Sequence, residues 1–423
     1  MRVLMITNYY PPCQYDWGYM QLCEETTEAL SARGHEVAVL TSVYRHGEEW
    51  KRPYPVHRLL PVDPDWHQGE SATRQFFLHH RQREQQSVQI LRQLVAEFQP
   101  DVIFAWHCIG LSRVMLQEAE NMPVPMVYYL ANYLPEMPDE YIRYWRKMPK
   151  PRVARWLKRI PATIALTMLA REGKPVSLRY PNTVCVSAYV RERLLTQGMI
   201  PESAVVIHNG IDLHTFSRKG SVKLADVPSL CCLVAGRVAA EKGVHTVINA
   251  FAQLKDQKMV NRFALTILGD GPAEYMAYVR GLVQQHGLEE IVTFQPPVPR
   301  EQMPQVLSQY HIFILPSEYA EPLARAGQEA MGMGLLVVGT TTGGSGELTI
   351  HRQTGYVFAA GDAGSLAAQL QDIAHNPQQA ELIAQAGQEM VLSHFHMDRM
   401  GDEVEQYLAS LIAVNQEKER QLA

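Results

Sequence analysis

The sequence predicts an α/β protein of two domains, each built on a parallel sheet with helices on both faces. Three observations lead to this prediction. The chain has 423 residues, which is too long for one ordinary domain and fits two domains of roughly 200 residues each. Short, continuous apolar runs indicate strands that are buried on both faces. These runs alternate with helical patterns in both halves of the chain, as in repeated βαβ units.

The first half opens with one complete βαβ unit. The expected first strand is Val3–Thr7, a helix is expected from Gly18 to Ala32, and Gly34 ends this helix before a strand at Glu36–Thr41. Further strands are expected at 102–105, 126–129, 183–187 and 204–207. The second half repeats the pattern, with strands expected at 230–235, 264–268, 291–294, 311–315 and 335–338.

The boundary between the two halves is expected near residues 210–228, where Asn209-Gly210 and Pro228 interrupt the pattern. We therefore place an N-terminal domain at 1–212 and a C-terminal domain at 213–396. Two such doubly wound domains that face each other leave a central cleft at the carboxyl ends of their strands. Ligands of open α/β sheets bind in that position.

Composition excludes several classes of protein. The net charge of −5 gives no general attraction to nucleic acid. The six cysteines form no C-x-x-C pair, which argues against a zinc site and a disulfide framework and favours the reducing cytoplasm. The N-terminal apolar run is short and lacks a cleavage site for a signal peptide. Ile160–Ala170, the longest later apolar stretch, is about half of a membrane span.

A basic loop between a strand and a helix is the first candidate site. Residues 236–243 read GRVAAEKG and precede a helix expected at His245–Leu254. Glycine lets the backbone approach a phosphate, the helix N-terminus supplies N–H groups, and Arg237 and Lys242 neutralise charge. The alternative is that both cations are solvated surface charges, which is common for Arg and Lys.

Two carboxylates follow a later strand. Residues 317–334 read SEYAEPLARAGQEAMGMG, and a helix is expected to begin near Leu323. Glu321 then precedes the helix at the mouth of the cleft, and Glu329 lies two turns into it. Carboxylates accept bidentate hydrogen bonds from the vicinal hydroxyls of a ribose or a hexose. The alternatives are an exposed helix residue for Glu329 and a charge matched to the helix dipole for Glu321.

Four shorter motifs are first of all turns. TGGSGE at 342–347, LGDGP at 268–272 and HNGID at 208–212 combine the residues that turns require. DPD at 63–65 lies in a Pro-rich loop and is also interpreted as a turn, not as a metal-binding pair of carboxylates.

Taken in order, the motifs carry a resemblance to a known family. The set NYYPP, GHEV, HNGID, GRVAAEKG, LTILGDGP, LPSEYAEPLARAGQEAMGMG, TGGSGE and TGYVF resembles glycosyltransferase family 4, the retaining enzymes of the GT-B fold. The match covers nearly the whole chain and is strongest from about 205 to 360. The resemblance implies two Rossmann-like domains and a C-terminal helix, at about 397–414, that crosses back onto the first domain.

The resemblance also assigns roles to the matching positions. Arg237 and Lys242 would bind the diphosphate of a nucleotide-sugar donor, and Glu329 would bind its ribose. Glu321 would contact the transferred sugar near the reacting face. Gly18 would let the backbone approach the donor phosphates and the acceptor. His107 matches a histidine near the anomeric centre, and the alternative for it is a buried structural histidine.

Several positions depart from the family pattern. Leu323 and Ala324 replace a usual Phe-Gly pair, and the added methyl group of Ala324 narrows the expected sugar pocket. Arg325 replaces an aliphatic residue. Because a cation near a helix N-terminus opposes the dipole, we expect Arg325 to meet a phosphate or an acidic sugar. The alternative is a surface Arg paired with a nearby Glu. Pro296 replaces a glycine in the base-binding loop, and Leu130-Ala131 replaces a common second histidine.

A basic and aromatic stretch lies in the first half. Residues 141–159 contain eight Lys or Arg and no Asp or Glu, with interleaved Tyr and Trp, and the apolar segment Ile160–Ala170 follows. This composition suits contact of 141–170 with anionic lipid or an anionic acceptor, which would place a cytoplasmic protein at the inner face of the membrane. Pro149 and Pro151 are expected to prevent one long helix. The alternative is a solvated basic face with aromatic packing beneath.

The expected reaction moves a hexose from a nucleoside diphosphate to a hydroxyl acceptor, such as a glycan or a lipid-linked or polysaccharide precursor. The cations and helix N-termini can stabilise the leaving diphosphate, so neither a metal nor another cofactor is expected. One rival is a sugar-nucleotide epimerase of the same fold, which would form no glycoside. Another is a catalytically inactive scaffold that binds nucleotide-sugar. Donor turnover separates the three.

Overall fold

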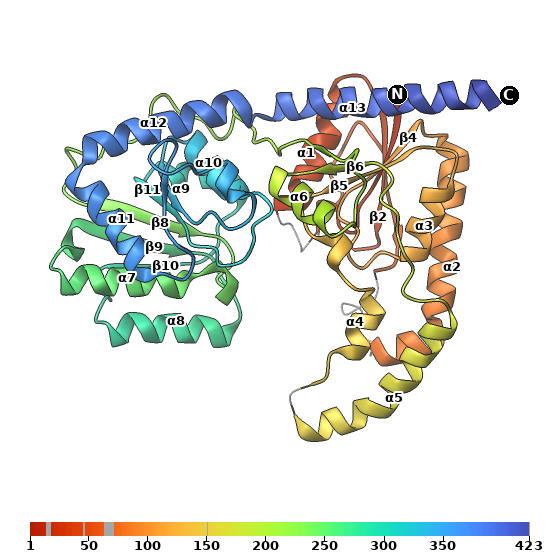
Figure 1. Cartoon of the computed structure of the whole chain (residues 1–423), viewed down its shortest axis with the longest axis horizontal. Coiled ribbons are helices and arrows are strands. Elements are labelled where there is room, and N and C mark those ends of the chain that lie inside the picture. Colours follow the sequence, from red (N-terminus) through yellow and green to blue (C-terminus); the bar gives the residue numbers. More distant parts are fainter. Residues whose placement is uncertain (14–17, 45–46, 63–71, 150, 423) are drawn as a thin grey trace. The chain divides into compact units, whose positions relative to one another are not determined.

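The chain forms two compact units (Figure 1). The computed structural model describes residues 1–13, 18–44, 47–62, 72–149 and 151–422. The first unit comprises Met1–Val186, Val190–Ile207 and Gly401–Ala423, and the second comprises Ser187–Tyr189 and His208–Met400. The turn expected at 63–65 lies outside the described residues.

The first unit is built on a seven-stranded parallel sheet in the order β3-β2-β1-β4-β5-β6-β7. Its strands are β1 (Arg2–Ile6), β2 (Glu36–Ser42), β3 (Val56–Leu60), β4 (Val102–Ala105), β5 (Met126–Leu130), β6 (Thr183–Cys185) and β7 (Val205–Val206). In the central register Met5 lies opposite Val39 on one side and Phe104 on the other. All residues of β4 and β5 are buried, as the continuous apolar runs predict.

Helices connect these strands. They are α1 (Gly18–Ala32), α2 (Ala72–Phe98), α3 (Arg113–Asn121), η1 (Leu134–Glu136), α4 (Glu140–Arg146), α5 (Arg152–Arg171) and α6 (Ala188–Thr196). Gly34 lies two residues after the end of α1. Its φ is +85°, a conformation that glycine adopts without strain. The prolines between α4 and α5 separate two helices, as expected.

The second unit repeats this architecture with a six-stranded parallel sheet in the order β10-β9-β8-β11-β12-β13. Its strands are β8 (Leu230–Ala235), β9 (Phe263–Leu268), β10 (Val292–Gln295), β11 (Ile312–Leu315), β12 (Leu336–Gly339) and β13 (Tyr356–Val357). Its helices are η2 (Ala240–Lys242), α7 (Val244–Asp256), η3 (Val260–Arg262), α8 (Ala273–Gln285), η4 (Arg300–Gln302), α9 (Met303–Leu307), α10 (Arg325–Gly332), η5 (Gly344–Glu347), α11 (Ala363–His375) and α12 (Pro377–His394).

The chain ends in the long helix α13 (Met397–Leu422), which extends beyond the expected 397–414. From Gly401 onward α13 belongs to the first unit. There Arg33 donates a hydrogen bond of 2.8 Å to Asp402, and the ring of His35 lies 2.9 Å from Glu405. The C-terminal helix therefore returns to the first domain, as the resemblance implies.

The predicted class of fold, two doubly wound parallel α/β domains, is confirmed. In each sheet the order reverses between two neighbouring strands, β1 and β4 in the first unit and β8 and β11 in the second. Such topological switch points are where ligands of open α/β sheets bind. Two strands were not expected: β3 is a half-exposed strand with polar residues, and β13 has only two residues.

One helix boundary was wrong. Helix α10 begins at Arg325 and not near Leu323, because Ala324 adopts an extended conformation with ψ of 97°. Glu329 is therefore the fifth residue of the helix and lies about one turn in, not two.

Candidate active site

A cavity of about 190 Å³ opens at the switch point of the second unit, between the carboxyl ends of β8 and β11. It is lined by the end of β8 with the loop after it, by the start of α7, and by the segment that joins β11 to α10. Its charged lining residues are Arg237, Lys242, Arg325 and Glu321, which carry a net charge of +2. The cavity therefore offers three cations to an anionic ligand, although each of them also has a carboxylate partner.

The loop after β8 packs closely against the segment after β11. Gly243 has a φ of +67°, and a Cβ atom on it would lie 2.0 Å from the carbonyl oxygen of Pro316. Any larger residue would force the two segments apart. The second glycine of GRVAAEKG thus brings the N-terminus of α7 and Lys242 to the end of β11, where Glu321 follows.

Glu321 is held by three side chains. The ammonium group of Lys242 and the hydroxyl of Tyr319 both donate hydrogen bonds to its carboxylate, and Ser317 Oγ donates one of 2.8 Å to Oε1. Lys242 Nζ also donates to the hydroxyl of Tyr319 over 3.2 Å. Glu321 and Ser317 are buried. The carboxylate is therefore fixed in position, with roles for Ser317 and Tyr319 that sequence reasoning missed.

Glu329 is also buried and paired. Its side chain is only 9% exposed, and Arg300 Nη1 donates a hydrogen bond of 2.6 Å to Oε1. Arg325 lies one helical turn earlier, with its Nε 3.4 Å from the same oxygen. The alternative of an exposed helix residue is therefore wrong. Arg300 was missed because it lies 29 residues away, outside any local pattern.

Arg237 differs from Lys242 in exposure. Its side chain is 57% exposed, and its Nη2 donates a hydrogen bond of 2.5 Å to Glu241, four residues later. Arg237 nevertheless lines the cavity. A long, exposed guanidinium group can turn toward an anionic ligand at little conformational cost, because surface ion pairs contribute little to stability.

The positions that depart from the family pattern also line the cavity. Leu323 and Ala324 are buried and contribute to its wall. The alternative for Arg325 was a surface arginine paired with a nearby Glu. Its side chain is only 10% exposed, so it is not a surface residue, but it is paired with Glu329. Its guanidinium group brings positive charge to the N-terminal turn of α10.

His107 lies at the switch point of the first unit, two residues after the end of β4. Asn8, which follows β1, donates from Nδ2 to the carbonyl oxygen of Ile109 over 2.7 Å, and its Oδ1 lies 2.8 Å from His107 Nδ1. Asn8 Oδ1 is thus an acceptor, which places the ring proton on Nδ1 and leaves Nε2 as the acceptor nitrogen.

Burial lowers the pKa of His107 to about 4, so the ring is neutral at pH 7. The ring packs edge-on against Tyr19, with 5.0 Å between the ring centroids. The neutral imidazole is therefore a fixed hydrogen-bond acceptor. Asn8 was part of the NYYPP motif, but sequence reasoning gave it no role.

Gly18 is the first residue of α1 and is exposed. It belongs to the first unit, with His107, whereas the other candidate residues belong to the second unit.

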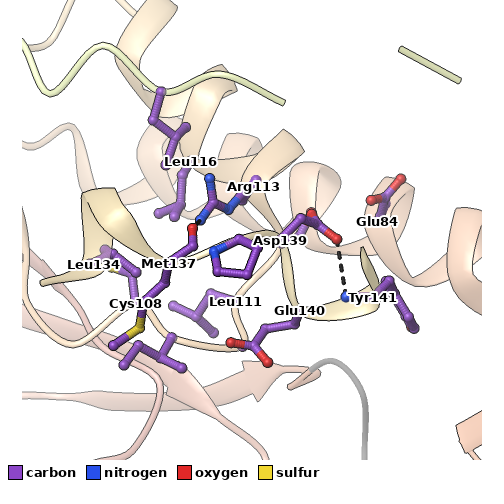
Figure 2. A pocket seen from close by; sticks show the side chains of 15 residues that line it. Glu84, Cys108, Leu111, Arg113, Leu116, Leu134, Met137, Asp139, Glu140 and Tyr141 are labelled. Carbon is purple, nitrogen blue, oxygen red and sulfur yellow. Dashed lines mark hydrogen bonds between the residues drawn. The ribbon is translucent and has the colours of Figure 1, made fainter. Parts of the chain in front are cut away.

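The residues that follow His107 in the sequence line part of a small pocket in the first unit (Figure 2). Cys108, Leu111 and Arg113 line it, together with Asp139 and Glu140. Asp139 accepts a hydrogen bond of 3.0 Å from the backbone N of Tyr141 and caps α4. The volume is about 20 Å³, which holds about one water molecule, so this pocket is too small for a sugar.

Cys108 lines this pocket but is no nucleophile. Burial raises the pKa of its thiol to about 12, and the nucleophilic form of cysteine is the thiolate.

The described part of the chain contains no group of three or more His, Cys, Asp or Glu placed to hold a metal ion. None of the described helices combines the length and the apolar character needed to cross a bilayer.

Similar folds occur in solved glycosyltransferases of the GT-B class. Sucrose-phosphate synthase from Thermosynechococcus elongatus superposes with a TM-score of 0.71 at 19% identity, over 98% of this chain and 99% of that one. HepE from Anabaena, in complex with UDP and glucose, has a TM-score of 0.67 at 18% identity, over 96% and 99%. These likenesses define the class of fold.

Sequence models define the family. The model described as Glycosyltransferase Family 4 matches residues 21–215, and the model described as glycosyl transferases group 1 matches residues 222–390. This chain belongs to the family 4 glycosyltransferases, as its motifs led us to expect.

Curated relatives match part of the chain. A putative colanic acid biosynthesis glycosyltransferase of Salmonella typhimurium is 34% identical over 183 residues, which are 42% of this chain and 44% of that protein. The chain spans about half the length of the first curated relatives that it matches.

Proposed function

We propose that this protein is a retaining glycosyltransferase that moves a hexose from a nucleoside-diphosphate sugar to a hydroxyl acceptor. The observation that carries the proposal is the cationic cavity at the β8–β11 switch point. It combines the cations Arg237, Lys242 and Arg325 with the N-termini of α7 and α10. Helix N-termini and cations together form a site for a diphosphate.

The donor diphosphate is assigned to Arg237 and Lys242. Gly243 and Ala324 are the N-cap residues of α7 and α10, and neither has a side-chain oxygen that could cap the helix. The backbone N–H groups of a helix's first turn point toward its N-terminus, where they suit phosphate oxygens, and Val244, Arg325 and Ala326 of these turns line the cavity. As the bond between the anomeric carbon and the phosphate oxygen breaks, these groups stabilise the growing charge of the leaving diphosphate.

The sugar ends of the donor are assigned to the two carboxylates. Glu329 would accept hydrogen bonds from the ribose hydroxyls, and Glu321 would bind the transferred sugar. Both are pre-organised by cations and hydroxyl groups, so binding need not order them. Binding of UDP and glucose by HepE, which has a similar fold, supports a nucleotide-sugar as the donor class.

The acceptor end is assigned to His107, with Gly18 giving the backbone room beside it. In a retaining transfer the acceptor oxygen attacks from the face that the diphosphate leaves, and its proton passes to a leaving phosphate oxygen. His107 Nε2 would accept a hydrogen bond from a sugar hydroxyl near the anomeric centre. This mechanism uses the chain's own groups and requires no metal. The acceptor class is a glycan or a lipid-linked precursor.

The first test is thermal unfolding with UDP, GDP and ADP, followed by their common sugar conjugates. A ligand at one hundred times its Kd stabilises the native state by about 2.7 kcal/mol, which gives a clear shift in Tm. We expect a shift with one nucleotide, which Arg237→Ala and Glu329→Ala abolish. A protein that no nucleotide shifts at millimolar concentration would contradict the donor assignment.

Product analysis separates the rival functions. A transferase releases free nucleotide and forms a new glycoside with retained configuration when acceptor is present. An epimerase would isomerise the donor without an acceptor, and a scaffold would bind the donor and leave it unchanged.

A further inference from the structure

Helix α5 has two apolar faces. The inner face packs Ala162, Ala165 and Leu169 into a buried cluster with Phe76 and Trp145. The second face, called here the outer face of α5, points to solvent. Its members are Val153 (72% exposed), Trp156 (68%), Leu157 (60%), Ile160 (64%) and Ile164 (50%).

The outer face is one continuous stripe. At 3.6 residues per turn its five members fall within a sector of about 100°, the width of the apolar stripe by which an amphipathic helix contacts a partner. Single exposed apolar residues are ordinary, but a contiguous apolar surface marks an interaction site. In Figure 1, α4 and α5 project beyond the sheet of the first unit.

Positive charge is concentrated around this stripe. Residues 141–171 contain nine Lys or Arg and no Asp or Glu, whereas the whole chain has a net charge of −5, so the remainder carries −14. Arg152, Arg155 and Arg159 are exposed and lie beside the outer face of α5 on the same helix. An anionic surface would thus attract this region and repel the rest of the chain.

A hollow of about 250 Å³ adjoins the stripe. It is lined by Met148, Arg152, Arg155, Trp156 and Arg159, so three guanidinium groups and an indole ring surround it without a carboxylate. Arginine is well suited to a phosphate group, because its planar fork can donate two parallel hydrogen bonds. Trp156 is suited to the boundary between headgroups and acyl chains.

We propose that the outer face of α5 and its flanking arginines dock the protein on an anionic lipid bilayer. The helix would lie in the plane of the interface, with the apolar stripe among the acyl chains and the arginines on lipid phosphates. A second copy of this chain fits less well, because a symmetric contact would bring the same arginines face to face. The proposal does not depend on the donor assignment, which concerns the other unit.

The test is flotation of the full chain with vesicles of phosphatidylcholine alone and of phosphatidylcholine with one third phosphatidylglycerol. We expect binding to the anionic vesicles at low salt and its loss at about 1 M NaCl, where the Debye length falls to about 3 Å. Absence of binding to anionic vesicles at low salt would overturn the proposal.

Two variants separate the charge from the apolar stripe. Each basic residue near an anionic membrane contributes about fivefold in affinity, so Arg152→Gln/Arg155→Gln/Arg159→Gln should weaken binding by about a hundredfold. The matched control is Lys219→Gln/Lys223→Gln/Arg420→Gln, on exposed cations elsewhere, which should bind as the wild type does. Equal loss of vesicle binding in both triple variants would mean that the total charge of the chain drives binding, and would contradict a defined docking surface.

The apolar variant is Leu157→Gln/Ile160→Gln, and its control is Leu382→Gln/Val414→Gln, whose side chains are similarly exposed at 60% and 52%. We expect at least a tenfold loss in the former alone. Unchanged thermal unfolding and nucleotide binding of each variant would show that the fold and the donor site are intact. If the wild type binds no vesicles but self-associates, and Leu157→Gln/Ile160→Gln abolishes the self-association, a second copy covers the face and the proposal is wrong.

Discussion

Arg300 donates a hydrogen bond of 2.6 Å to Glu329, and the two residues come from segments that are far apart in the sequence. The pair joins η4 to α10 and fixes the carboxylate that we assign to the donor ribose. The guanidinium group of Arg300 also lies 4.8 Å from the ring centroid of Phe216. A second cation, Arg325, lies one turn earlier in α10, with its Nε 3.4 Å from the same carboxylate oxygen.

Arg300→Ala should destabilise the protein, because it leaves the buried carboxylate of Glu329 with one cation fewer. We expect the free energy of unfolding to fall by about 1–3 kcal/mol in urea titration. Lys223→Ala is the control, since its side chain is 79% exposed, and should change stability by less than about 0.5 kcal/mol. Equal stability of Arg300→Ala and the wild type would mean that the pair contributes nothing.

Arg237→Ala should separate donor binding from stability. Because Arg237 is exposed and its ion pair with the nearby Glu241 lies at the surface, its removal should change stability by less than about 0.5 kcal/mol. Loss of a charge-assisted contact to the diphosphate should weaken nucleotide binding about tenfold or more in calorimetry. Arg352→Ala is the matched control: Arg352 is 60% exposed and paired with Asp372. Equal nucleotide affinity of these two variants would refute the role of Arg237.

Arg325→Ala should change the donor preference. If Arg325 contacts an acidic sugar, binding of a nucleotide-linked uronic acid should weaken about tenfold while the neutral hexose donor binds as before. If it contacts the diphosphate, both donors should weaken alike. Arg325→Lys, which keeps the charge, should retain part of the affinity in either case. A variant with unchanged affinity for both donors would remove Arg325 from the site.

His107 should make stability depend on pH below neutrality. Its pKa in the native state is about 4, below the unfolded value of about 6.5, so the unfolded state binds the proton more readily. The stability contributed by the neutral ring is therefore complete above pH 6.5 and is lost as the pH falls from 6.5 toward 4. The loss approaches about 3 kcal/mol at most.

The free energy of unfolding, measured by urea titration at several pH values in this range, should depend less steeply on pH for His107→Gln than for the wild type. His375→Gln, at an exposed position, is the control, and its free energy of unfolding should depend on pH as that of the wild type does. The same pH dependence of the unfolding free energy in the wild type and in His107→Gln would show that His107 is not desolvated as described.

The sequence predicted the fold well because its strands are buried on both faces. Such strands must be continuously apolar, and Val102–Ala105 and Leu230–Ala235 matched β4 and β8 residue for residue. The half-exposed β3 escaped detection, since a strand with polar residues at a sheet edge has no such run. The start of α10 was misplaced because Pro322 to Ala324 contain no capping side chain that would mark it.

The candidate site was predicted in part. Its residues at strand ends could be found, because every strand-to-helix loop at one edge of a parallel sheet faces the same crevice. The partners Arg300, Ser317 and Asn8 could not be assigned, because their roles depend on contacts made in three dimensions. Asn8 and His107, for example, are 99 residues apart in the chain.

The sequence by itself thus determined the two α/β domains, most of their strands and the motifs that end those strands, because hydrophobic periodicity and turn chemistry are local. Only the tertiary structure decided which charges are buried and paired. It paired Glu329 with two arginines, fixed the proton of His107 through Asn8, and left one apolar face of α5 exposed while burying the other. Burial and pairing set the energy of a charge or an apolar side chain, and both depend on residues brought together from distant parts of the chain.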